Sequence, residues 1–184
     1  MKTNKPIIPL FIITLPFIVI IIIGTLAISV MSTMENKRFI DGTNLILSVP
    51  KAVTTLLKTR PVTLMPNDNI LDMLSNVSLF PKKPEYSDYS NPWGGQFQAF
   101  AVDNNIFRIH TVITPSVCRK LSLYFGKYDF SNVGLSAMYA NPDNNVDSWA
   151  VTFSKAKKEP ASKIGTACGN GASTRTIIEF SVVK

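Results

Sequence analysis

A long uncharged apolar segment near the N-terminus constrains this chain more than any other feature. Between Pro6 and Met34 there is no charged residue, and residues 7–30 are dominated by Ile, Leu, Phe and Val. A bilayer core of about 30 Å is spanned by about 20 apolar residues in a helix, and a helix satisfies its own backbone hydrogen bonds in lipid. We therefore expect a tail and a transmembrane helix within residues 1–34, and a globular domain over residues 35–184.

The charges that flank this segment predict its orientation. Lys2 and Lys5 precede it, whereas Glu35, Lys37 and Arg38 follow it. Short basic tails tend to stay on the cytoplasmic side of the membrane. The sequence therefore predicts a cytoplasmic N-terminus and a domain on the far side.

A cleaved secretory signal is the alternative interpretation of the same segment. The apolar core of such a signal has about 7–15 residues and ends in a small-x-small cleavage site. The core here is longer, which favours a membrane anchor. Residues 25–29 (Thr-Leu-Ala-Ile-Ser) nevertheless offer small side chains at the required spacing, so cleavage stays open as an alternative.

The charge balance bears on the class of partner. The chain carries 19 Lys and Arg against 12 Asp and Glu, a net charge of +7. The basic residues are scattered, as in Lys82-Lys83 and Arg119-Lys120, and form no long run. A dedicated nucleic-acid site usually shows such a run or patch. A solvated basic surface is therefore favoured over nucleic-acid binding.

Two cysteines, Cys118 and Cys168, lie well beyond the apolar segment. On the oxidising side of a bacterial membrane an isolated pair predicts a disulfide. In the chain-entropy model, closing a loop of about 50 residues stabilises the fold by about 4 kcal/mol. A zinc site is disfavoured because the chain has one histidine and no CxxC spacing.

Hydrophobic periodicity divides the rest of the chain into helices followed by strands. Residues 38–58 are apolar at helical intervals and should continue the membrane helix, bent at Pro50 and ended by Pro61. Asn67-Asp68-Asn69 can cap a short helix that ends before Pro81.

The C-terminal part of the chain changes to a two-residue period. The expected elements are strands over 96–101 and 106–113, a helix over 115–125 stopped by Gly126, and strands over 133–139, 149–154 and 174–183. In the helix, Val117, Leu121 and Tyr124 should face inward. This order predicts an α+β fold with an antiparallel sheet.

The sequence offers little catalytic chemistry. His110 is the only histidine, and we expect it to share a strand face with Arg108 and Val112. No serine has a GxSxG context, and no glycine-rich loop has phosphate-binding spacing. We therefore expect no enzyme and no cofactor, with a hydrolase built on His110 as a weaker alternative.

An oxygen-rich segment, residues 141–147, raises the question of calcium. It contains Asp143 and Asp147 among three asparagines. Oxygen ligands suit Ca²⁺, but the EF-hand spacing and its terminal Glu are absent. A turn is favoured, and no metal site is expected.

One motif links the chain to a known family. Asn91-Pro92-Trp93-Gly94-Gly95 leads into the predicted strand hairpin. It resembles the NPWGG segment of type IVb pilins, particularly the thin-pilus pilins of conjugative plasmids.

Three further features, in the same order, resemble that family. A short helix of the form P-x-x-C follows the hairpin, here at residues 115–118, and a second cysteine, Cys168, comes near the C-terminus. A final apolar strand, here around residues 176–180, ends the chain. The resemblance covers residues 35–184 and implies a pilin-like head.

The resemblance implies a structural subunit of a type IVb pilus or a related conjugation or secretion apparatus. Its partners would be other pilin subunits, packed through their apolar helices, and the inner-membrane assembly machinery. The chain would reside in the bacterial inner membrane with its head in the periplasm, or outside the cell within a pilus. A membrane-anchored periplasmic binding or accessory protein is the alternative.

The N-terminus departs from the family pattern. Pilins of this group are usually cut after a glycine just before the apolar helix and carry a glutamate at the fifth mature position. Here no glycine precedes Ile7, and the first acidic residue is Glu35. The resemblance therefore applies to the head more than to processing.

Overall fold

The computed structural model describes residues 10–60, 62–81, 89–142, 148–156 and 159–183, with side chains from Met31 onward. The chain divides into two compact units, Met1–Arg38 and Phe39–Lys184. The described part of the first unit is the beginning of helix α1 (Leu10–Thr59). Within the described residues, no helix has the combined length and hydropathy of a membrane span. The side chains of the predicted span, residues 7–30, lie outside the part that is described.

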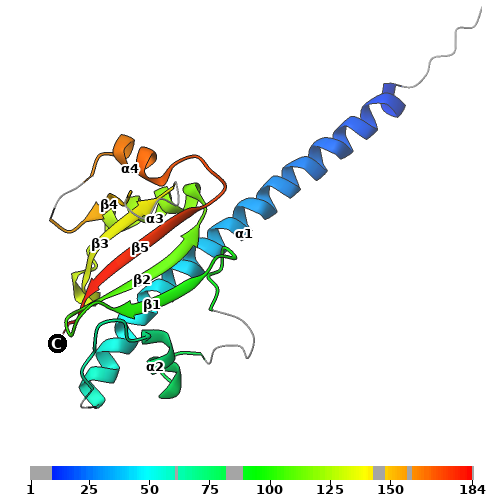
Figure 1. The fold of residues 1–184 in the computed structure, drawn as a ribbon. Coiled ribbons are helices and arrows are strands. Elements are labelled where there is room, and N and C mark those ends of the chain that lie inside the picture. The colour runs from blue at the N-terminus through cyan, green and yellow to red at the C-terminus, as the bar shows by residue number, and fades with distance from the viewer. Residues whose placement is uncertain (1–9, 61, 82–88, 143–147, 157–158, 184) are drawn as a thin grey trace, which may run out of the picture. The chain divides into compact units, whose positions relative to one another are not determined.

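The second unit, which we call the head, is an α+β fold with a five-stranded sheet (Figure 1). All strand pairs are antiparallel, in the order β1-β2-β5-β3-β4, which confirms the predicted fold class. After α1 the elements are α2 (Ile70–Asn76), β1 (Phe97–Ala101), β2 (Ile106–Ile113), α3 (Pro115–Lys127), the 3₁₀ turn η1 (Ser131–Val133), β3 (Leu135–Asn141), β4 (Ala150–Ser154), α4 (Ala161–Cys168) and β5 (Thr174–Ser181).

The C-terminal half of α1 contributes one apolar face to the core of the head. Its buried residues recur every three or four positions, as a helix packed on one side requires. Ile40, apolar but on the opposite side, is 58% exposed. The helix runs through Pro50 and ends at Thr59, just before Pro61 as expected. The buried apolar residues of this face are Ile46, Val49, Val53 and Leu56.

The sheet has one buried and one partly exposed face. In β2, Phe107, Ile109 and Ile113 are buried, whereas Arg108 and His110 alternate with them on the opposite face. The last strand, β5, lies at the centre between β2 and β3, with α1 and α3 behind the sheet in Figure 1. The rings of Phe107 and Phe180 stack across β2 and β5 at 5.3 Å.

The β1 edge of the sheet is covered by backbone from the preceding loops. The Asn67 N–H donates to the Ala101 carbonyl at 2.8 Å, and the Ala101 N–H donates to the Asp68 carbonyl at 3.0 Å. The Phe97 N–H donates to the Tyr89 carbonyl at 2.9 Å. These bonds occupy groups that an open edge would offer to another strand. The predicted short helix is confirmed as α2, whose N-cap Asn69 accepts a bond from the Asp72 N–H.

Helix α3 differs from its prediction in length and in facing. It begins as expected, with Thr114 as N-cap and Pro115 in the first turn, but continues through Gly126 to Lys127. Leu121 is buried as predicted, whereas Val117 and Tyr124 are only partly buried. Helix α3 contacts the rest of the head on two faces. One face lies on the sheet, and on the other the Tyr124 ring contacts Phe39 of α1, with 5.9 Å between the ring centres. The sheet side is made by Cys118, Leu121, Ser122 and Phe125.

Two further boundaries were not predicted. The strand predicted over 133–139 runs from Leu135 to Asn141 as β3, because Val133 ends η1 and Gly134 has a left-handed conformation (φ +77°). Helix α4 was missed altogether, because its short sequence has only three buried residues to mark a face. These are Ile164, Ala167 and Cys168.

Candidate functional site

The Asn91 side chain fastens the NPWGG segment to strand β2. Its amide oxygen accepts hydrogen bonds from the backbone N–H of Trp93 (2.8 Å) and of Gly95 (3.1 Å). Its amide nitrogen donates to the Thr111 hydroxyl (2.7 Å) and the Val112 carbonyl (2.8 Å). Asn91 is only 4% exposed, and these bonds satisfy the polar groups that burial takes from water.

Both glycines of the motif occupy positions that resist a side chain. Gly94 has φ +84°, a conformation that L-residues rarely adopt. A Cβ on Gly95 would overlap the carbonyl of Val112. The motif is therefore a tight turn held against β2.

The same turn reaches helix α1 through its tryptophan. The six-membered ring of Trp93 lies so close to Gly42 that a Cβ there would overlap it. Gly42 therefore provides a shallow site on α1 for the indole. The Asn91-to-Gly95 segment thus joins α1 to the sheet.

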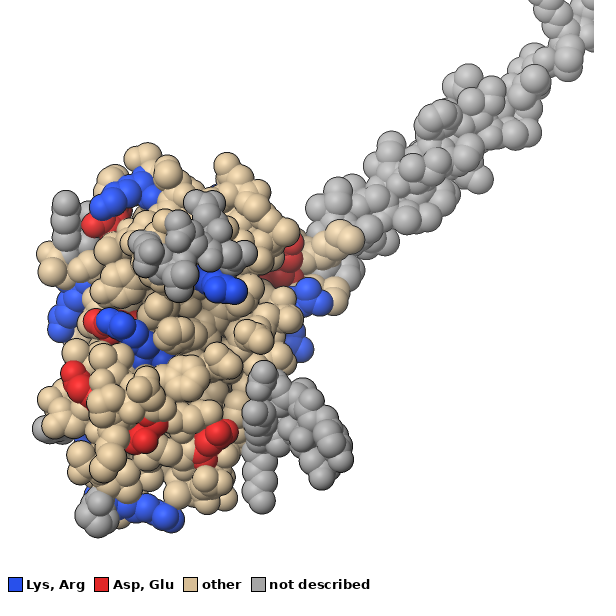
Figure 2. Space-filling model, viewed as in Figure 1, with Lys and Arg blue, Asp and Glu red and all other residues tan. Residues whose placement is uncertain are grey.

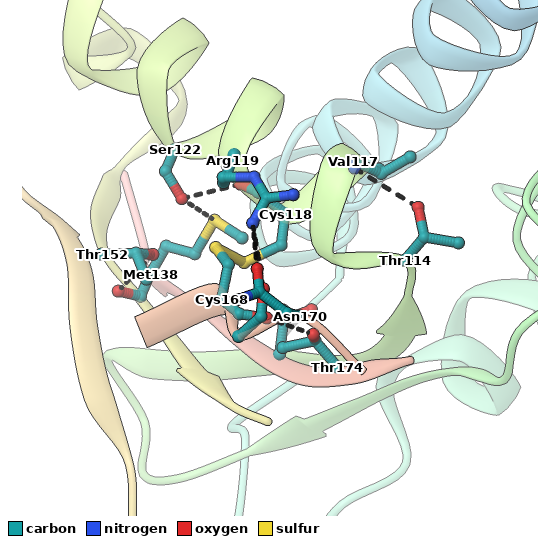
Figure 3. The surroundings of a disulfide bond; sticks show 12 residues. Thr114, Val117, Cys118, Arg119, Ser122, Met138, Thr152, Cys168, Asn170 and Thr174 are labelled. Carbon is teal, nitrogen blue, oxygen red and sulfur yellow. Dashed lines mark hydrogen bonds between the residues drawn. A yellow bond between two sulfur atoms is a disulfide. The ribbon is translucent and has the colours of Figure 1, made fainter. Parts of the chain in front are cut away.

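The predicted disulfide between Cys118 and Cys168 is present (Figure 3). It joins α3 to α4 with a Cα–Cα distance of 5.8 Å, and both cysteines are fully buried. Arg119 adds a second link, since its guanidinium donates to the Gly169 carbonyl at 2.9 Å. The Thr174 hydroxyl donates to the Cys168 carbonyl at 2.6 Å, tying the end of α4 to β5.

A pocket of about 600 Å³ opens where α3 ends, between η1, β4 and the beginning of α4. We call it the aromatic pocket. Its described lining residues fall between positions 122 and 164, inside the segment that the disulfide closes. Sequence reasoning missed it, although the aromatic-rich stretch over residues 124–130 was a signal. Its aromatic lining is Phe125, Tyr128, Phe130 and Phe153.

Charged side chains border the aromatic pocket. The Lys127 ammonium lies 5.3 Å from the centre of the Tyr128 ring, a cation–π arrangement. Hydrogen bonds from the backbone and hydroxyl of Ser131, and the nearby charge of Lys155, lower the pKa of Asp129. Glu159 also lines the pocket.

His110 lies on the other face of the sheet, with Arg108 and Val112 as predicted. Its ring meets Phe100 edge-on at 5.9 Å, and burial together with the charge of Arg108 lowers its pKa. The cavity beside it, about 310 Å³, contains no hydroxyl, thiol or carboxylate among its lining residues. Among the described residues, the lining of this cavity thus brings no nucleophile to His110. The lining is Asn67, Phe100, Ala101, Val102, Arg108 and His110.

The other charged residues that the structure describes form no cluster that resembles a binding site. In the described part of the chain, no three His, Cys, Asp or Glu side chains come together as metal ligands. Asp143 and Asp147, the calcium alternative, lie outside the described residues. On the face shown in Figure 2, basic and acidic side chains are interspersed.

Comparison with known proteins gives no relative. No family model, no curated protein and no solved structure matches this chain. The functional conclusion therefore rests on the residues and contacts described above.

Replacing a glycine inside a helix by alanine usually stabilises the helix. The contact between Gly42 and Trp93 predicts the opposite effect at position 42. Gly42→Ala should destabilise the head by about 1–3 kcal/mol because the new methyl group overlaps the indole. In a Trp93→Ala background the same change should be neutral or stabilising by up to about 1 kcal/mol. Urea unfolding of the full-length chain in detergent, followed by circular dichroism, measures both.

Gly126→Ala in α3 is the matched control, since a Cβ there meets nothing within 4 Å. It should not destabilise the head in either background. An equal cost of Gly42→Ala with and without Trp93 would contradict the contact.

The disulfide predicts a large dependence of stability on the redox state. Cys118→Ser should lower the free energy of unfolding by about 4 kcal/mol, because the unfolded chain regains the freedom of a closed 50-residue loop. Urea unfolding of the variant beside the oxidised wild type measures the loss. Equal unfolding midpoints for oxidised and reduced wild type would show that the bond contributes nothing.

Proposed function

We propose that this chain is a pilin-like structural subunit of a type IVb pilus or a related conjugation or secretion apparatus. It assembles with other copies through its apolar N-terminal helix. The observation that carries the proposal is the single helix α1, which runs without interruption from Leu10 in the apolar segment to Thr59 in the head. The helix thus joins the segment that would pack with other copies directly to the head.

The head supports this role through its construction. The part of α1 from Phe39 onward belongs to the compact unit of the head, and its buried face packs into the sheet core. A force applied to this part of the helix is therefore transmitted to the sheet. The Asn91-to-Gly95 turn and the disulfide add two further connections around the same core.

The apolar segment gives assembly its driving interaction. Residues 7–30 have no charge, so they suit a bilayer before assembly and the packed interior of a filament after it. A head-to-tail interface between identical subunits does not close, so subunits add indefinitely. The chain would wait in the bacterial inner membrane, with a cytoplasmic N-terminus and a periplasmic head, for the assembly machinery.

A membrane-anchored periplasmic binding or accessory protein is the second candidate. The aromatic pocket, of about 600 Å³, is the observation that favours it. Pockets of roughly this volume with apolar walls and a few polar groups commonly bind small ligands. This candidate predicts a chain that stays in the membrane and does not enter a filament.

Shearing distinguishes the two candidates. Surface filaments are sheared from cells, pelleted and analysed by mass spectrometry, with a cytoplasmic protein and an unrelated inner-membrane protein as contamination controls. We expect this chain in the sheared fraction, and the peptide at its N-terminus reports any cleavage. Confinement of the intact chain to the membrane fraction would overturn the proposal in favour of the second candidate.

A further inference from the structure

The described lining of the aromatic pocket carries no net charge. Two lysines, Lys127 and Lys155, face two carboxylates, Asp129 and Glu159, in that lining. Glu159 is already paired within the head, because the Lys163 ammonium lies 2.9 Å from its Oε2 atom. A charged ligand would lose hydration on entering and would meet no excess of opposite charge in return. The pocket therefore favours a ligand without net charge.

The charges at the mouth of the pocket also act on one another. The Lys127 ammonium lies 5.3 Å from the centre of the Tyr128 ring. Lys155 is close enough to Asp129 for its charge to act on that carboxylate. A cation or an anion that entered would compete with these contacts. A hydroxyl group both donates and accepts hydrogen bonds, so it can bond to a lysine or to a carboxylate without separating the two.

The same pocket offers aromatic surface. Tyr128 is 49% exposed, and Phe130 and Phe153 are only partly buried. The face of an aromatic ring is electronegative, whereas the C–H groups on one face of a sugar ring carry a small positive charge. Packing such a face against an aromatic ring therefore combines dispersion with a favourable electrostatic contact.

A purely apolar ligand would suit the pocket poorly. Ser131 and Ser154 line it together with the charged groups. An apolar ligand would remove these polar groups from water and offer no hydrogen bonds in exchange. The lining thus requires a ligand that is apolar on one side, hydroxylated on the other and uncharged.

We propose that the aromatic pocket binds one ring of an uncharged sugar. The C–H face of the ring packs against the exposed aromatic walls, and its hydroxyl groups bond to Asp129 and Lys155. The volume of about 600 Å³ is within the range of about 300–1,000 Å³ that is usual for small-ligand sites. This inference goes beyond the proposed function and does not depend on it, because the pocket belongs to the head whether or not the chain enters a filament.

The test measures sugar binding to the full-length chain by saturation-transfer NMR, in a detergent without a sugar headgroup. The probes are glucose, galactose, mannose and N-acetylglucosamine. We expect at least one to bind with a dissociation constant in the millimolar range. Transfer from the wild type to none of these sugars would overturn the proposal.

Two further sets of probes define the ligand. The amino sugar and the uronic acid derived from the sugar that binds add a positive or a negative charge to the same ring. Both should bind more weakly, and tighter binding of either would overturn the proposal of an uncharged ligand. Binding of the methyl glycoside would assign the ligand to the end of a glycan chain, and binding of the free sugar alone would assign it to a free sugar.

Substitutions locate the sugar in the aromatic pocket. Asp129→Ala should weaken binding about tenfold, as for the loss of a hydrogen bond to a charged group. Tyr128→Ala removes an exposed aromatic wall without opening the core and should weaken binding about fivefold or more.

Asp103→Ala is the matched control for Asp129→Ala. Asp129 accepts a bond from the Ser131 N–H at 2.8 Å, and Asp103 accepts one from the Asn105 N–H at 2.7 Å in a turn that does not line the pocket. The control should bind the sugar like the wild type. Equal melting temperatures of the variants and the wild type show that a loss of binding does not come from unfolding. Unimpaired binding by both Tyr128→Ala and Asp129→Ala would place the sugar elsewhere and overturn the proposal.

Discussion

The packing of α1 against the sheet is the interaction on which the rest of the head depends. A helix within a protein gains most of its stability from such tertiary packing, and the inner face of the sheet needs a cover for its aromatic and branched side chains. Burying side chains such as Ile46 and Val53 contributes about 1.5–3 kcal/mol each. Neither the helix half nor the sheet is complete without the other. This is why the head boundary falls inside α1, at Phe39.

Two connections refine this packing. Trp93 on Gly42 fixes where along α1 the NPWGG turn sits, and Asn91 fixes that turn to β2. At the other connection, the disulfide joins α4 to α3, and the aromatic pocket lies within the segment between the two cysteines. Under the proposed function, the Trp93 and Asn91 contacts transmit force from α1 to the sheet. The disulfide stabilises the part of the head that contains the aromatic pocket.

Local patterns predicted much of this fold. Strict alternation identified β1 to within one residue and β2 to the residue. Thr114 followed by Pro115 identified the start of α3. The disulfide followed from cysteine count and compartment, and its location in α3 from the helix prediction. Such features depend on residues that are close together in the chain, so they can be predicted from one sequence.

The parts that were missed depend on contacts between distant residues. Gly126 did not end α3, because the head continues to contact that helix up to its last turn. The central place of β5 cannot be derived from strand patterns, since several antiparallel orders bury the same faces. The sequence analysis gave Glu159 no role, since only the fold brings it to the same pocket as Phe153 of β4.

The central claim is that copies of this chain associate through their N-terminal helices in an open-ended series. Photo-crosslinking in intact cells tests it most directly, with a photoreactive phenylalanine analogue replacing Ile20 and the products separated by size. The account predicts a ladder of dimers, trimers and higher multiples of this chain. A chain that stays monomeric, or that gives one product with a different protein, would contradict it.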